Sequence, residues 1–414
     1  MRTWRLPVLF AGAVLSFPLL AVAAEPGTTT SNTAAAAAGL SLHHAVARAW
    51  QRSVLVKTLE ARRDEAAAGQ AVAQSWLAAA PTLGMSERSG RWVDQRAQRE
   101  TEIAISAPVL LPDQQSARRQ FAARSADEIE AQLHRARLEV AGLVRLRLWE
   151  AAAASELLAE KKAHLHHLDE LNGAVQRRVA AGDLARSDGM LAAQEVLAAQ
   201  GEAAAARSRA REALNSFRLL TGLSQLPELA PEPLSSNPAV HGRLQAAEAS
   251  EQRARAAVTL ASASVIGAPT VSLSMRRERD TASSGADRSI GIGLQIPLGG
   301  KIRNRPAETL AATQLATAAA ELSEARAALA MDADSARGQL MDAAEALETA
   351  LERAAVMRQH TALFEKAFAQ GERGLAELLH SRTLTHEAEV AARQREIALG
   401  LAHAQLNQAL GILP

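Results

Sequence analysis

The sequence is constrained most by a set of landmarks that recur at one spacing. A short alternating segment ending in proline occurs twice, as "AISAP" and as "GLQIP", and each is followed by a long run without strong helix breakers. Four landmarks pair at an offset of 188 or 189 positions: Pro81 with Pro269, Pro108 with Pro297, Gly182 with Gly371, and Gly222 with Gly411. A fixed offset at four places predicts two copies of one structural unit.

Each unit contains a pair of predicted strands, which follow a shorter helix. Apolar and polar residues alternate in these segments, which is the pattern of a half-buried strand. We expect one β-hairpin over residues 82–106 and a second over 269–296. The apolar side of the four strands consists of Leu83, Met85, Ile103, Ile105, Val271, Leu273, Met275, Ile290, Ile292, Leu294 and Ile296.

Each unit continues with one very long helix. Apolar residues spaced by three and four predict coiled-coil packing from Pro112 to about Ala181, and a second long helix from Pro306 to about Gln370. About 70 residues at ~1.5 Å each give a helix near 100 Å. Shorter helices are predicted over 40–80, 187–220 and 239–264, and from the second turn to the end of the chain. Two of them stacked end to end match one long helix in length.

The chain therefore divides into a leader and two repeats. Basic Arg2 and Arg5, an apolar stretch and small residues before position 25 predict a cleaved signal peptide over 1–24. A flexible segment is expected over 25–39. The first repeat covers 40–222, a proline-rich linker covers 223–238, and the second repeat covers 239–414. The expected fold class is mainly α, with an internally duplicated coiled coil and a small β portion.

Composition and motifs argue against several classes of protein. The formal net charge of +1 favours no nucleic-acid partner. The chain has no cysteine, which excludes disulfides, thiolate metal sites and a lipidated N-terminal cysteine. Walker, dinucleotide-binding, zincin and G-x-S-x-G motifs are absent, so we expect no enzyme and no cofactor. In "HLHHL" (164–168), the spacing does not bring all three imidazoles to one helix face, so no metal site is expected.

Strands of this length with one apolar and one polar face can be interpreted in two ways. Such strands cross a bilayer only inside a closed barrel, and four strands are too few to close one. Several chains must then contribute to a shared barrel. The alternative is two soluble hairpins that cap a coiled coil. The absence of tyrosine favours that alternative, because membrane barrels carry aromatic girdles.

The order of these motifs resembles the outer membrane efflux proteins of the TolC family. The resemblance rests on "APTL", "SAPVLLP", the linker with "NPAV", "APTVSLSM", "GLQIPLGG", "FAQGERGLAELLHSRTLTHEAEVA" and "LNQALGIL", and it covers essentially the whole mature chain. Within the family, the chain is most similar to the shorter CzcC-like members of heavy-metal efflux systems. Unlike many relatives, it has no cysteine for N-terminal lipidation.

The resemblance implies an architecture and partners. Three copies would form a homotrimer with a shared barrel of twelve strands in the Gram-negative outer membrane, in contact with lipid. A helical tunnel would cross the periplasm and dock onto a periplasmic adaptor protein and an inner-membrane pump of the resistance-nodulation-division type. The chain would be a passive export channel for heavy-metal cations.

The resemblance also assigns candidate site residues. The two helix turns would form the periplasmic tip and contact the adaptor through Gly182, Asp183, Leu184, Arg186, Ser187, Gly371, Glu372, Arg373, Gly374 and Leu375. Asp188 and Glu377 lie at matching repeat positions and would form acidic rings at the aperture, with His380 one turn later. Such rings attract cations, and a histidine makes their field depend on pH.

Four alternatives remain open at the sequence level. The residues of the two turns can serve only to end the helices, since glycine terminates helices. The acidic residues of the predicted aperture can lie on a solvated helix face. The chain can be a soluble periplasmic coiled-coil spacer or adaptor. It can also be a type I secretion duct of the same family.

Overall fold

A computed structural model of the chain describes residues 40–89, 99–234, 240–280 and 285–414. The expected signal peptide, the expected flexible segment and residues 235–238 of the linker lie outside them. The described residues form seven helices and four strands. The first unit contains α1 (Leu42–Arg52), α2 (Val54–Ala73), β1 (Thr82–Ser89), β2 (Arg99–Pro108), α3 (Pro112–Ala181) and α4 (Arg186–Thr221). The second contains α5 (Gly242–Ala263), β3 (Thr270–Arg279), β4 (Asp287–Gln295), α6 (Lys301–Ala369) and α7 (Leu375–Ala409).

The single helix expected over 40–80 is wrong, because the chain breaks at Ser53 and ends its helix at Ala73. Ser53 is extended; its N–H bonds the carbonyl of Trp50, and its hydroxyl accepts from the N–H of Val56. One serine thus ends α1 and begins α2. A serine hydroxyl competes for backbone N–H groups, which makes it a strong N-cap wherever it falls in a helical pattern.

Two further boundaries differ from expectation near the start of α6. The helix begins at Lys301, five residues before the expected Pro306. Pro306 therefore lies inside α6, where it has no N–H to bond the carbonyl of Ile302. Strand β4 ends at Gln295, the partner of Thr270, so Ile296 lies outside the strand.

The four strands form one antiparallel sheet in the order β1-β2-β3-β4. The central pairing of β2 with β3 joins the two repeats. The register aligns the predicted apolar residues across the sheet: Leu83, Ile105, Leu273 and Ile292 form one row, and Met85, Ile103, Met275 and Ile290 form another. The alternate rows contain glycine, alanine, serine and charged residues. The predicted two-faced character of the strands is therefore confirmed.

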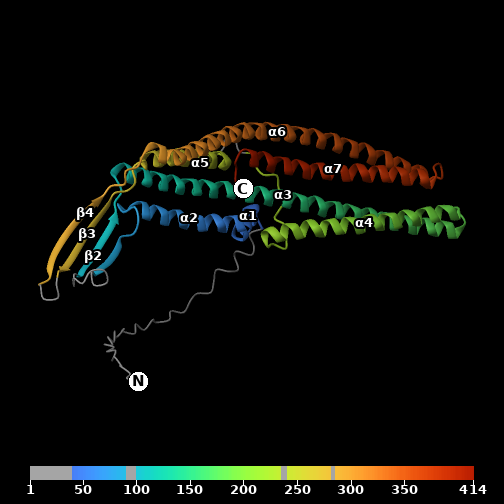
Figure 1. Cartoon of the computed structure of the whole chain (residues 1–414). Helices are drawn as coiled ribbons and strands as arrows, with labels where there is room; N and C mark the ends of the chain where they lie inside the picture. Colours follow the sequence, from blue (N-terminus) through green and yellow to red (C-terminus); the bar gives the residue numbers. More distant parts are fainter. Residues whose placement is uncertain (1–39, 90–98, 235–239, 281–284) are drawn as a thin grey trace, which may run out of the picture. The chain divides into compact units, whose positions relative to one another are not determined.

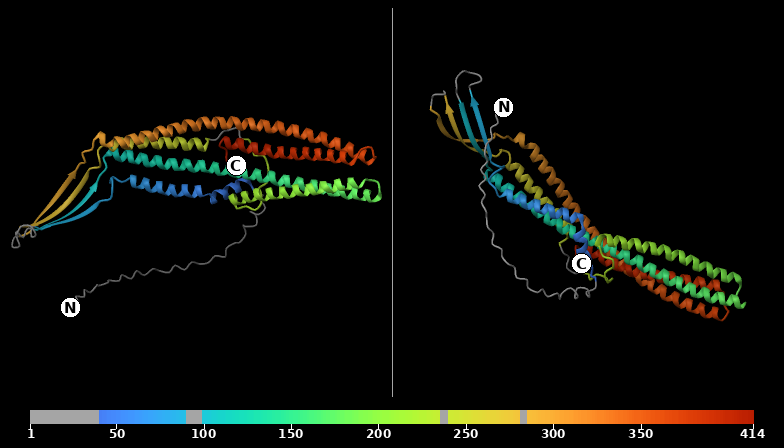
Figure 2. Two further views of the ribbon diagram at one scale, coloured as in Figure 1. Left: turned by 45° about the vertical axis from the view of Figure 1, so that its right-hand side comes forward. Right: turned by 90° about the horizontal axis from the view of Figure 1, so that it is seen from below.

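The helices of the described unit form a single row. Helix α3 packs against α2 and α5 near the sheet, and against α4 and α7 toward the hairpin turns; α6 packs against α5 and α7 (Figure 1). The two further views show the same row, in which α2 and α4 follow each other along α3 (Figure 2). α3 and α6, of 70 and 69 residues, run the length of the row. α6 is accompanied by two shorter helices, as predicted, and α3 by three, because the helix expected over 40–80 is divided into α1 and α2.

Small residues allow this close packing. The buried side of α4 is a stripe at heptad spacing, formed by Ala192, Val196, Ala199, Ala203, Ala206 and Ala210. On α7, a Cβ atom added to Gly400 would lie 2.2 Å from the indole ring of Trp149 on α3. The alanine-rich, aromatic-poor composition is thus explained by backbones that lie close together.

A buried ionic network fixes the linker and the C-terminus to α3. The guanidinium of Arg145, which is 2% exposed, donates to both carboxylate oxygens of Glu232 at 2.8 and 2.6 Å. It also donates to Gln408 Oε1 at 2.7 Å and to the carbonyl of Ile412 at 3.0 Å. Asn407 donates to Glu232 at 3.3 Å. Two repeats and their connection therefore meet at one arginine.

Candidate functional site

The two helix turns lie together at the end of the row opposite the sheet (Figure 1). We define the tip as these turns, residues 182–185 and 371–374, together with the first turns of α4 and α7. Both turns are built alike. Gly182 and Gly371 have φ of 85° and 78°, a left-handed conformation that glycine adopts without strain. In each case the next N–H bonds a carbonyl five residues back, which closes the end of the long helix.

The predicted tip residues differ in exposure. Leu375, the first residue of α7, is 4% exposed and packs with Leu379 against Leu168 and Val175 of α3. Leu184 is half-buried against the same cluster. The other predicted tip residues are exposed: Asp183, Arg186, Ser187, Glu372, Arg373, Gly374 and the two turn glycines. The leucines therefore join the two hairpins, and the polar residues remain available to a partner.

The three residues predicted to line the aperture, Glu377, Asp188 and His380, differ in exposure and in hydrogen bonding. The carboxylate of Glu377 accepts from the N–H of Gly374 at 3.2 Å and from Arg373 Nη1 at 2.9 Å. These bonds, the backbone bond first, lower the pKa of Glu377 below its usual value. Glu377 thus caps α7 and stays ionised. Its repeat counterpart Asp188 is half-buried in the first turn of α4, and His380 is exposed.

Two cation–π contacts at the tip have no counterpart in the sequence prediction. The Arg373 guanidinium lies 5.4 Å from the ring centre of Phe364. Arg178, in the last turn of α3, lies 5.2 Å from the ring centre of Phe368 on α6. The second contact bridges the two repeats. The only sequence signal for it is an arginine and a phenylalanine one turn before each glycine.

A histidine pair lies between the hairpins farther from the tip. His164 on α3 and His386 on α7 stack with ring centres 3.9 Å apart and planes 8° apart. Lys161 and Glu202 form an ion pair of 2.7 Å beside them. Burial, and then the charge of His164, lower the pKa of His386 to about 4. Burial and Lys161 likewise lower the pKa of His164. Both rings are therefore neutral at pH 7.

No described group of three or more histidine, aspartate or glutamate side chains is arranged to hold a metal ion. His166 and His167 are about 70% exposed beside Glu170, as expected for an outward face.

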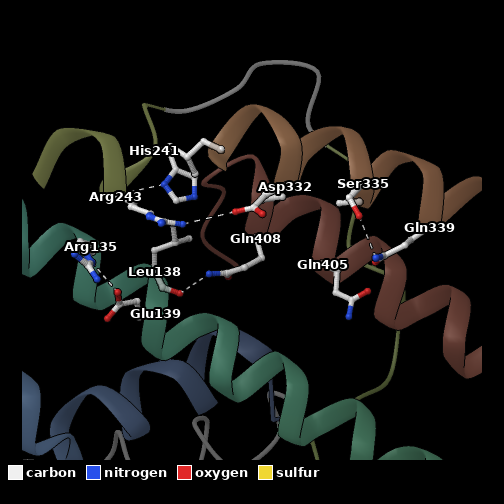
Figure 3. A pocket seen from close by; sticks show the side chains of 13 residues that line it. Arg135, Leu138, Glu139, His241, Arg243, Asp332, Ser335, Gln339, Gln405 and Gln408 are labelled. Atoms are coloured by element: carbon white, nitrogen blue, oxygen red, sulfur yellow. Dashed lines mark hydrogen bonds and ion pairs between the residues drawn. The ribbon is translucent and has the colours of Figure 1, made fainter. Parts of the chain in front are cut away.

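A cavity of about 470 Å³ lies beside α6, between the start of α5 and the end of α7 (Figure 3). Its charged groups pair with one another. Arg135 bonds Glu139 at 2.7 Å, and Arg243 approaches Asp332 at 3.8 Å across the cavity. The amide of Gln408 donates to the carbonyl of Leu138 at 2.9 Å. These interactions hold the helices together around the cavity. The charged side chains that line it are therefore paired and do not form a group of free acids and bases directed at one point.

The sheet presents its apolar face to the outside. Ten of the eleven predicted apolar residues lie in strands, and their side chains are 43–84% exposed. Ile296 is also exposed, just beyond β4. Within the described residues, no strand pairs with the outer edge of β1 or of β4. None of the described helices is long and apolar enough to cross a membrane.

Comparisons with known proteins bear on the fold. No protein-family model matches the sequence, and no curated protein matches it. Among solved structures, a membrane protein from Pseudomonas aeruginosa superposes with a TM-score of 0.74 at 17% identity, over 90% of each chain. The CmeC outer membrane channel of Campylobacter jejuni gives 0.73 at 14% identity, over 89% of this chain and 85% of that one. The outer membrane protein VceC of Vibrio cholerae gives 0.72 at 16%, over 89% and 96%. The chain therefore has the fold of these membrane proteins.

Proposed function

We propose that the chain is a passive export channel of the Gram-negative outer membrane, formed by three copies. The observation that carries this proposal is the sheet, whose apolar face is exposed and whose two outer edges lack partners among the described residues. Ten exposed apolar side chains are costly in water, at about 1.5–3 kcal/mol for each fully exposed one. Open edges also invite pairing with another chain.

Pairing of β4 of one copy with β1 of the next satisfies both edges. Three copies supply twelve strands, and a closed barrel is the arrangement in which strands can lie in lipid. Among the described helices, none packs against the outer side of α6 or of α2 and α4, so the row can close around the same axis. Similarity in fold to outer membrane channels supports this assembly. A signal peptide over 1–24 would direct export.

The tip is proposed as the aperture and the docking surface for a periplasmic adaptor, behind which an inner-membrane pump of the resistance-nodulation-division type drives transport. Three copies place three Glu377 and three Asp188 carboxylates around the axis. Their charge favours cations, which is consistent with a heavy-metal cargo of the CzcC-like kind. The channel itself carries out no catalytic step and needs no cofactor.

Conductance of the reconstituted protein tests this function. Purified trimers in a planar bilayer should give discrete steps, with a reversal potential that shows cation preference in a salt gradient. Glu377→Gln keeps a capping acceptor for Gly374 while removing the charge, so it should lower cation preference. Glu387→Gln, an exposed carboxylate farther along α7, is the matched control. A monomer recovered from the soluble periplasmic fraction would refute the channel.

Cargo is tested separately, because a secretion duct of the same fold would share the assembly. Cells lacking the chain should lose tolerance to Zn²⁺, Co²⁺ or Cd²⁺, and the wild-type chain should restore it. Loss of tolerance to an organic dye alone would overturn metal cargo and leave the channel intact. Loss of export of a protein substrate alone would indicate the secretion duct.

A further inference from the structure

The sheet and the helices meet at a level where several chain connections are hydrogen-bonded together. The N–H of Ala78 bonds the carbonyl of Pro108 at 2.8 Å, and the N–H of Leu110 bonds that of Trp76 at 2.7 Å. The N–H of Val109 bonds the carbonyl of Pro269 at 2.7 Å, which ties the two repeats. The base of the sheet is therefore held at a fixed place relative to the helix starts.

The connection from β4 into α6 carries the most exposed apolar side chains at this level. Leu298 is 97% exposed and Ile302 is 90% exposed. They follow the series of exposed apolar residues at every second position in β4, which Ile296 extends beyond the strand. The series of exposed apolar residues in the sheet thus continues along the sequence into the start of α6.

Three cations are interleaved with these two residues. Lys301, Arg303 and Arg305 are exposed, and none forms an ion pair with a described residue. They do not stabilise α6, because cations are favourable at the C-terminal end of a helix and not at its start. We call Leu298, Lys301, Ile302, Arg303 and Arg305 the junction patch.

The corresponding helix start in the first repeat uses its cations differently. Arg118 donates to the carbonyls of Leu77 and Ala78, and Arg119 donates to the carbonyl of Gln74. These arginines satisfy the chain at the end of α2. Among the described residues, Lys301, Arg303 and Arg305 have no such acceptor for their side chains.

We propose that the junction patch binds anionic phospholipid, with Leu298 and Ile302 in the outer part of the acyl region and the three cations on headgroup phosphates. Long basic side chains next to apolar residues suit the boundary between hydrocarbon and headgroups. Trp76, 52% exposed at the same level, is of the type that also lies there. The inference rests on the proposed function, since it requires the sheet to lie in a bilayer.

The test compares lipid binding by full-length protein purified in detergent and mixed with phosphatidylglycerol or phosphatidylcholine, with bound lipid counted by native mass spectrometry. Wild type should prefer phosphatidylglycerol. Replacing Lys301, Arg303 and Arg305 by Gln should reduce the preference about 100-fold, because each cation near an anionic surface contributes roughly fivefold. The control replaces the exposed Arg207, Arg209 and Arg211 of α4, which have the same spacing, and should keep the preference.

A second readout separates this inference from the proposed function. All three proteins are reconstituted into phosphatidylcholine vesicles and floated on a density gradient. Flotation of all three without any phosphatidylglycerol preference overturns the junction patch and leaves the channel standing. Failure of wild type to float overturns the channel and the patch together. Crosslinking from a photoreactive residue at position 298 should capture lipid; capture of a second copy of the chain instead overturns the lipid assignment.

Discussion

Replacing Arg145 by Met should destabilise the protein more than any change at an exposed arginine. The side chains of Arg145 and Glu232 are 2% and 11% exposed, and two charge-assisted hydrogen bonds join them. Without the arginine, a nearly buried carboxylate keeps, among the described side chains, only the amide of Asn407 at 3.3 Å. Removing one partner of a buried ion pair costs about 3–5 kcal/mol.

The expected change in melting temperature follows from chain size. The compact unit Leu40–Pro414, about 375 residues long, unfolds with an entropy of ~0.8 kcal/mol/K at about 2.1 cal/mol/K per residue. A loss of 3–5 kcal/mol then lowers the melting temperature by roughly 4–6 °C. The assay is the helical circular dichroism signal of the detergent-solubilised protein during heating, with Arg209→Met as the exposed control.

A double variant decides whether the ion pair is the cause. Arg145→Met with Glu232→Gln removes the uncompensated charge, so it should recover more than half of the lost melting temperature. A single variant that melts within 1 °C of wild type would refute the reasoning. So would a double variant that melts as low as the single variant.

Three further predictions use matched or internal controls. Gly400→Ala drives a Cβ into the indole ring beneath it and should cost about 1–3 kcal/mol, whereas Gly201→Ala meets no atom within 4 Å and should stabilise α4 by up to about 1 kcal/mol in the same melts. The pKa of His386, near 4 when folded, lies below its ordinary value of 6.5, so the unfolded chain binds more protons and stability should fall as pH drops from about 6.5 to 4. Allowing for solvent screening of a half-exposed ring, the loss is about 1–2 kcal/mol, and His386→Gln should remove it from denaturant titrations across pH. Leu273→Arg on the apolar face of the sheet should cost about 2–4 kcal/mol of membrane insertion and reduce trimer yield in the membrane fraction, whereas Ser274→Arg on the other face should be tolerated; equal yields would contradict the assignment of faces.

Periodicity was enough to predict the sheet and the order of the helices. Leu273 and Met275 alternate with serine, so their shared face follows from the geometry of a strand, and the register then aligns them with Ile105 and Ile103. The repeat offset similarly placed the two glycines that end α3 and α6. Both inferences depend only on local spacing.

Features that depend on pairing between distant residues could not be predicted in this way. Glu232 lies 87 positions from Arg145, and His164 and His386 meet only because α3 packs against α7. One signal for the first was present: an arginine at the apolar spacing of α3, between Ala141 and Leu148. The break at Ser53 was missed because a cap depends on one side-chain hydrogen bond that does not interrupt the apolar pattern.

The measurement that tests the central claim most directly is disulfide crosslinking between strand edges. The chain has no cysteine, so pairs can be introduced with Leu83→Cys or Met85→Cys on β1 and Ile290→Cys, Ile292→Cys or Leu294→Cys on β4. In one chain, these edges are three strand spacings apart, about 14 Å, beyond the reach of a disulfide. Any bond therefore joins different copies.

A closed ring of three copies makes a definite prediction. At least one of the six pairs should give a ladder of one, two and three copies in the outer membrane fraction, and the ladder should stop at three. A ladder that stops at two, or that continues past three, would contradict the shared twelve-stranded barrel. Absence of crosslinks for all six pairs, with the protein in the soluble fraction, would contradict the export channel itself.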